Sequence, residues 1–78
     1  MNADERLKLY ERMAMIACLN DEFKRLNKRT DDLMQMAESA HAKGDAGKLI
    51  VYEAEMAMNL RIMELLKDML RDTTKGLK

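Results

Sequence analysis

The 78-residue sequence has no proline or tryptophan, three glycines, one cysteine and one histidine. Because Cys18 is alone, the chain has no second thiol with which to form an internal disulfide. One Cys and one His also fall short of the four ligands of a structural zinc site. A chain this short usually needs a disulfide, a metal or oligomerisation to support its core. We therefore expect oligomerisation.

The sequence has no excess of charge of either sign, because 14 Lys and Arg residues balance 14 Asp and Glu residues. A net charge of zero provides no overall field to attract nucleic acid or an acidic membrane. No apolar run approaches the roughly 18 residues of a membrane-spanning helix. Residues 1–5 lack the basic start and apolar core of a signal peptide. Together with the lone thiol, these features predict a cytoplasmic protein with no membrane insertion and no nucleic-acid partner.

The sequence is rich in Ala, Leu, Met, Glu, Lys and Arg, whose side chains lose little freedom in a helix. The sequence therefore predicts an all-α fold. The segment Lys43–Gly47 is the clear break, because Gly44 suits the left-handed residue after a helix and Asp45 suits the N-cap of the next one. The predicted architecture is one domain, residues 1–78, an antiparallel helical hairpin that packs into a helical bundle with another chain. Its expected parts are a helix over about 3–43, a turn at 44–45 and a helix over about 46–72.

The first segment begins at Asn2, a predicted N-cap, with Glu5 three residues later as in a capping box. Steps of three or four residues then place one apolar stripe on a single helix face. Its members are Leu9, Met13, Ile16, Leu19, Phe23, Leu26, Thr30, Leu33, Ala37 and Ala40. Asn20 and Thr30 both suit an N-cap, so the helix is either continuous, which we favour, or broken near one of them.

The second segment carries apolar residues on two adjoining sides. The first stripe consists of Leu49, Tyr52, Met56, Leu60, Met63, Leu66 and Leu70. What we call the second stripe consists of Val51, Met58, Ile62, Leu65 and Met69. A hairpin partner covers one stripe, and burying five more side chains at roughly 1.5–3 kcal/mol each rivals the whole stability of a small domain. We therefore predict that the second stripe binds another protein chain.

The two segments also differ in length, and the excess lies at the N-terminus. Residues 13–19 are apolar on every side of a helix, a pattern typical of buried helices. This stretch is expected either to fold back as a third helix or to enter another subunit. Met13 and Ile16 are accordingly added to the predicted partner-binding residues. Eight methionines beyond Met1 exceed ordinary usage, and methionine fits adaptable binding surfaces. Of these, Met56 and Met63 are expected to fill the core, and Met58 and Met69 to lie at an interface.

No constellation of side chains indicates catalysis, so we predict no enzyme, no catalytic residue, no cofactor and no metal. His41 fits the cationic end of a helix, and Cys18 is expected to be buried and inert. Asp31 and Asp32 are adjacent, so they do not face each other on a helix. The basic run 24–29 is flanked by acidic residues at spacings that allow ion pairs, which predicts a self-neutralised face.

The hairpin junction resembles a known family. Gly44-Asp45-Ala46, followed by Leu49, Val51 and Tyr52 and then a helix rich in Glu, Ala and Met, is similar to the small E-type co-chaperones of bacterial type III secretion needles, the YscE-like family. The resemblance covers about residues 35–70. Where that family more often has its first aromatic residue, this chain has Leu49.

The resemblance implies a non-enzymatic co-chaperone of the bacterial cytoplasm. Such a protein pairs with a second chaperone built of tetratricopeptide-like repeats, and the pair keeps the needle subunit monomeric before export. We also expect self-association when the chain is alone. The alternative, from another functional class, is a homodimeric four-helix bundle that acts as a regulator or binds nucleic acid through residues 24–29.

Overall fold

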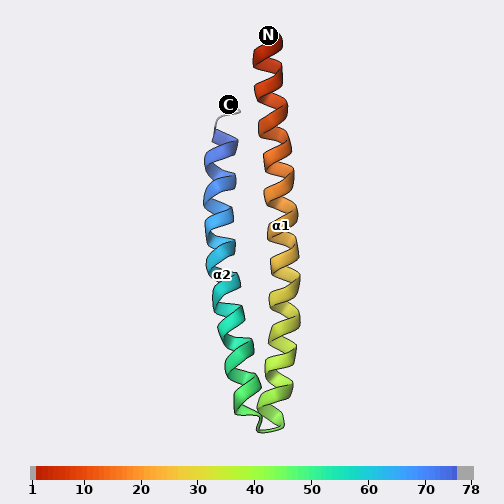
Figure 1. Ribbon diagram of the computed structural model, residues 1–78, viewed down its shortest axis with the longest axis vertical. Coiled ribbons are helices and arrows are strands. Elements are labelled where there is room, and N and C mark those ends of the chain that lie inside the picture. The colour runs from red at the N-terminus through yellow and green to blue at the C-terminus, as the bar shows by residue number, and fades with distance from the viewer. Residues whose placement is uncertain (1, 76–78) are drawn as a thin grey trace.

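The computed structural model describes residues 2–75 and confirms the all-α helical hairpin. Helix α1 spans Ala3–Ala42 and helix α2 spans Ala46–Lys75. The two helices lie side by side and run in opposite directions, joined by one tight turn (Figure 1). The result is a rod with principal extents of 62 × 15 × 14 Å. A rod this thin has one internal interface, the strip where α1 and α2 meet.

Helix α1 is continuous, as favoured from the sequence. Thr30 does not cap a new helix but lies buried within α1, where its Oγ1 donates a hydrogen bond to the Leu26 carbonyl at 2.8 Å. Asn20 likewise lies inside α1. Within residues 2–75 the apolar stretch 13–19 does not fold back, so the alternative of a third helix is wrong.

Local hydrogen bonds explain where the helices begin and where the turn lies. Asn2 Oδ1 accepts from the Glu5 backbone N–H at 2.8 Å, which confirms the predicted N-cap. At the end of α1 the N–H of Asp45 donates to the Ala40 carbonyl at 2.9 Å, and that of Gly44 to His41 at 3.1 Å. This is the Schellman arrangement, and it requires the left-handed backbone that Gly44 adopts at φ 70°.

Asp45 then starts α2, as predicted. Its Oδ1 accepts from the Lys48 backbone N–H at 3.1 Å, the bond expected of an N-cap side chain. Because Gly44 and Asp45 act in succession, the chain reverses within a few residues.

Helix α2 ends later than predicted. It continues to Lys75, past the expected end near residue 72. Thr73 and Thr74, which follow the expected end, lie inside the helix, where Thr73 Oγ1 donates to the Met69 carbonyl at 2.7 Å and Thr74 Oγ1 to the Arg71 carbonyl at 3.0 Å. Gly76 is a residue type that suits a helix C-cap, and it lies outside the described residues.

The core follows an alternation of three- and four-residue steps on both helices, as in a coiled coil. On α1 the positions that meet α2 are Leu19, Phe23, Leu26, Thr30, Leu33, Ala37 and Ala40. On α2 they are Leu49, Tyr52, Met56, Asn59, Met63, Leu66 and Leu70. Leu33 is the most deeply buried residue, with 0% of its surface exposed.

The predicted first stripe of α2 contains one residue, Leu60, that does not lie in the core. Leu60 is 53% exposed, and Asn59 takes its place in the core with 7% exposed. The alternation explains the difference, because the steps Met56 to Asn59 to Met63 are three and four, whereas a path through Leu60 reverses them. Apolar character favoured Leu60, but the geometry of the helix pair selects its polar neighbour.

The length mismatch is confirmed. Helix α1 has 40 residues and α2 has 30, a difference of about 15 Å at the rise of an α-helix. The N-terminal turns of α1 project beyond the end of α2 (Figure 1). Near that end, Thr73 Oγ1 lies 3.7 Å from the sulfur of Met15. Leu7 and Tyr10, on the projecting part, are exposed.

Candidate partner-binding surface

The second stripe lies on the outside of α2. All five members are exposed, with between 39% of the surface accessible at Ile62 and 64% at Met58. Single exposed apolar residues are ordinary on protein surfaces, but a contiguous row is not. This row runs from Val51 to Met69, about 27 Å along the helix. Within residues 2–75 nothing covers this row.

The second stripe repeats with the same period as the core. Val51, Met58 and Leu65 are seven residues apart, and Ile62 and Met69 form a second set with the same spacing. A repeat of this kind keeps one line of side chains facing a neighbouring helix. Helix α2 therefore carries two apolar faces with this repeat, and α1 covers one of them.

Glu55 occupies the remaining position of that repeat, between Val51 and Met58, and it faces α1. Its Oε2 accepts from Arg29 Nε at 2.8 Å and its Oε1 accepts from Arg29 Nη2 at 3.3 Å. These hydrogen bonds, together with the charge of Arg29, lower the pKa of Glu55, and the same contacts raise the pKa of Arg29. The charge that interrupts the second stripe is thus neutralised by the neighbouring helix.

The two partner-binding residues predicted on α1 lie in different settings. Met13 is exposed on the N-terminal part of α1. Ile16 is half-buried and continues the seven-residue spacing of Phe23 and Thr30, which meet α2. The structure therefore places Met13 on the surface and Ile16 on the inner side of α1. It does not gather both residues into one patch with the second stripe.

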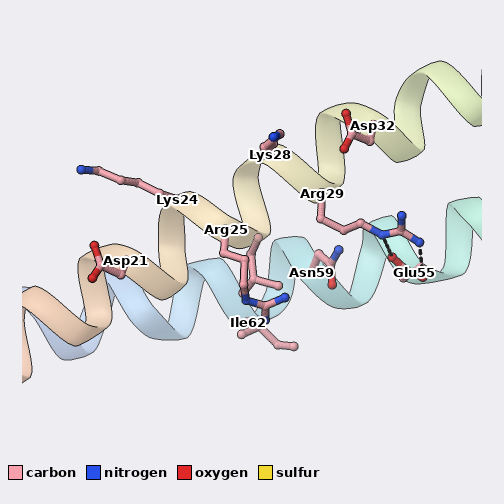
Figure 2. Close-up of a pocket in the computed structure, with 10 residues that line it drawn as sticks. Asp21, Lys24, Arg25, Lys28, Arg29, Asp32, Glu55, Asn59 and Ile62 are labelled. Atoms are coloured by element: carbon pink, nitrogen blue, oxygen red, sulfur yellow. Dashed lines mark hydrogen bonds and ion pairs between the residues drawn. The ribbon is translucent and has the colours of Figure 1, made fainter.

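A shallow cleft of about 780 Å³ opens between α1 and α2 beside the second stripe. The basic run 24–29 of α1 forms one wall together with Asp21 and Asp32, which flank it, and Glu55, Asn59 and Ile62 of α2 form the other (Figure 2). Ile62 belongs to both the cleft and the second stripe, so the two surfaces are continuous. Figure 2 shows Lys24 and Lys28 extending outward from α1 at the rim.

Two of the four basic residues of the run form ion pairs. Arg25 binds Glu22, with Nε donating to Oε2 at 3.1 Å, which confirms one of the predicted ion pairs along α1. That bond lowers the pKa of Glu22 and raises the pKa of Arg25. Arg29 pairs with Glu55, a partner on the other helix that the sequence did not indicate. No ion pair within residues 2–75 engages Lys24 or Lys28.

Asn59 is a buried polar residue that was not predicted from the sequence. Its Nδ2 is buried and finds no hydrogen-bond acceptor within the described chain. A buried donor without a partner costs about 1–3 kcal/mol, and such groups are rare in folded proteins. The signal was present in the sequence, because a strict alternation of three and four from Tyr52 reaches Asn59.

The single cysteine and the single histidine lie far apart along α1. Cys18 is exposed, so its predicted burial is wrong; its spacing places it off the α2-facing positions of α1. His41 is exposed near the end of α1. Across residues 2–75, no three His, Cys, Asp or Glu side chains come together as a metal site would need. Neither described helix is long and apolar enough to cross a membrane.

Comparison of the chain with models of known protein families, with curated proteins and with solved structures finds no match.

Proposed function

We propose that this protein is a non-enzymatic helical-hairpin co-chaperone that binds a second chaperone through the second stripe. The observation that carries the proposal is the exposed apolar row from Val51 to Met69 on the outer face of α2. A row with a helical repeat fits a partner that presents helices of its own, because such surfaces interlock through side chains at three- and four-residue steps. Tetratricopeptide-like repeats present surfaces of this type.

The resemblance around Gly44–Tyr52 supplies the specific form of the proposal. In that form the complex belongs to a bacterial type III secretion system, acts in the cytoplasm, and keeps the needle subunit monomeric before export. Helix α2, which contains most of the resembling segment, also carries the second stripe. Local structure and exposed surface thus favour the same helix as the binding element.

The test is co-expression of this chain with the tetratricopeptide-like chaperone and the needle subunit of one secretion system, followed by size-exclusion chromatography with light scattering. We expect one particle that contains this chain and the chaperone, with the needle subunit retained in soluble form. Leu65→Asp should release this chain from the particle, because a buried carboxylate without a partner is unfavourable. Leu60→Asp is the matched control, since Leu60 has the same 53% exposure as Leu65 but lies outside the second stripe.

Two results would count against the proposal. One is a stable monomer that never joins the chaperone. The other is loss of the complex with Leu60→Asp but not with Leu65→Asp.

Nucleic-acid binding by a homodimer is less well supported. Arg25 and Arg29, two of the four cations in the basic run, are already engaged by Glu22 and Glu55. Phosphate contacts would have to compete with these carboxylates. A gel shift at low salt, lost on Lys24→Ala with Lys28→Ala, is the observation that would restore this alternative.

A further inference from the structure

We propose that the second stripe also binds a second copy of this chain, with the two α2 helices packed antiparallel. The inference goes beyond the proposed function, because it rests on the order of side chains along α2 and needs no chaperone. It adds a competition to that function, since the second copy and the chaperone cover the same residues. The pairing is reversible, so the chain in dilute solution is a single hairpin.

The second stripe is the middle of a longer row on the outside of α2. Its alternation of three- and four-residue steps, which passes through Glu55, continues by one step to Lys48 at one end and to Asp72 at the other. Both end residues are exposed. What we call the outer row consists of Lys48, Val51, Glu55, Met58, Ile62, Leu65, Met69 and Asp72. It is basic at one end, acidic at the other and mainly apolar between them.

The outer row is complementary to its own reverse. Its steps read the same in both directions, so a two-fold axis at the level of Leu60 sets apolar side chains of the two copies face to face. Val51 then lies opposite Met69 of the second copy, and Met58 lies opposite Ile62 of the second copy. A contact of this kind uses one surface twice and closes as a dimer.

The charges at the two ends determine the direction of pairing. In the antiparallel arrangement Lys48 lies opposite Asp72 of the second copy, and symmetry repeats this pair at the other end. A parallel arrangement would instead bring like charges together at both ends, which is unfavourable. Within residues 2–75, Asp72 forms no ion pair, and Lys48 Nζ lies 3.9 Å from Asp45 Oδ2 in an exposed pair. Both end charges are therefore available to a second copy.

Glu55 is the charged residue inside the outer row, where it lies opposite Leu65 of the second copy. Its carboxylate turns toward α1 and is held there by the two hydrogen bonds from Arg29 (Figure 2). The row therefore presents no unpaired charge between its ends.

Two further charged residues, Arg61 and Asp68, flank the outer row on the exposed side of α2. Arg61 lies near the axis and faces the same residue of the second copy, and Glu64 Oε2 lies 3.9 Å from its Nη1. Asp68 Oδ1 accepts a hydrogen bond from Arg71 Nη2 at 2.6 Å. Each flanking charge thus has an opposite charge within its own chain, which leaves the ends of the outer row to decide the direction.

A shallow hollow on the outside of α2 lies at the level of the proposed axis. It has a volume of about 430 Å³ and is lined by Ala57, Met58, Arg61 and Ile62. Ala57 contributes only a methyl group, so the hollow has room for a side chain from a facing helix, as knobs-into-holes packing requires. The axis brings Met58 and Ile62 of the second copy to this place.

Disulfide cross-linking of the purified full chain tests the direction and the register, in a Cys18→Ser background that removes the natural thiol. An equimolar mixture of Val51→Cys and Met69→Cys chains should form a linked pair, because these positions lie opposite each other. Val51→Cys alone should not, because its two copies lie about 27 Å apart in the antiparallel pair. Leu60→Cys is the second control, since Leu60 is exposed at the level of the axis but lies outside the outer row. We expect at least about tenfold more linked product from the mixture than from either control.

Exchange of the end charges tests their role. Lys48→Glu and Asp72→Lys should each weaken the dimer about threefold to tenfold at low salt, as measured by analytical ultracentrifugation, because each brings like charges together. The double variant should regain the wild-type affinity, since it rebuilds the pair with reversed polarity. Lys8→Glu makes the same charge change as Lys48→Glu on α1, away from the outer row, and should have no effect. Circular dichroism checks that each variant stays helical.

A chain that stays monomeric at every concentration overturns the inference and leaves the second stripe to a different protein. Linked product from Val51→Cys alone that equals the product from the mixture also overturns it, because the helices would then be parallel. So does a double charge variant that binds no more tightly than the single variants. A dimer that behaves as expected in a chain that never joins the chaperone would support this inference and contradict the proposed function, so the two can fail separately.

Discussion

Arg29 on α1 and Glu55 on α2 join the two helices through paired hydrogen bonds, at 2.8 Å from Nε to Oε2 and 3.3 Å from Nη2 to Oε1. The pair joins the basic run of α1 to the position of Glu55 beside the second stripe. Arg29 thereby neutralises the negative charge in an otherwise apolar row. Both side chains remain partly exposed to water. Solvent screening therefore limits what the pair contributes to stability.

Glu55 should make the hairpin slightly less stable in acid. Its pKa is lowered by folding, so its contribution is present above the unfolded-state value near 4.5 and is lost as the pH falls through the lower folded-state value. Glu55→Gln should therefore lower the melting temperature a little at pH 7 and have no effect near pH 2. Thermal unfolding followed by circular dichroism measures both. Glu53→Gln, at an exposed position nearby, serves as control; an effect of Glu55→Gln that does not change with pH would contradict the prediction.

Asn59→Leu should stabilise the free hairpin. The substitution removes a buried donor that has no acceptor within residues 2–75 and places an apolar side chain between Met56 and Met63. We expect the free energy of unfolding to rise by about 1–3 kcal/mol. Urea unfolding measures the change, with the exposed Asn27→Leu as the matched control. A loss of stability would show that Asn59 has an acceptor or a packing role not seen in the chain alone.

Leu33→Ala should lower the free energy of unfolding much more than Leu60→Ala does, because Leu33 lies in the core and Leu60 on the surface. Leu33 is fully buried, and its truncation should cost about 2–5 kcal/mol through lost burial and the cavity left behind. Leu60 is exposed despite its predicted place in the core, and its truncation should cost within about 0.5 kcal/mol. Equal losses for the two variants would mean that the helices pack in the register first expected from the sequence.

Much of the fold depends on local chemistry, which is why the sequence predicted it. The cap at Asn2, the left-handed turn at Gly44 and the cap at Asp45 each depend on residues within a few positions along the chain. The continuity of α1 and its greater length likewise follow from the order of residues along the chain. These features need no knowledge of what the helix touches.

The wrong predictions concern residues whose burial or pairing depends on how the two helices contact each other. An apolar pattern assigns Leu60 to the core, but the register of the pair selects Asn59. Cys18 lies in an apolar run and is nevertheless exposed, because α2 covers only one side of α1. The pairing of Arg29 with Glu55 joins residues 26 positions apart, beyond the reach of any spacing rule within one helix.

Oxidation of surface methionines tests the central claim most directly. Met58 and Met69 belong to the second stripe, while Met34 lies on α1 with a similar exposure, so all three should react with peroxide at similar rates in a dilute solution of the purified chain. Mass spectrometry after peroxide treatment of the native cell extract gives the comparison. We predict that Met58 and Met69 are protected there and that Met34 is not. Oxidation of all three at equal rates in the extract would show that the second stripe remains uncovered and would contradict its role as a binding surface.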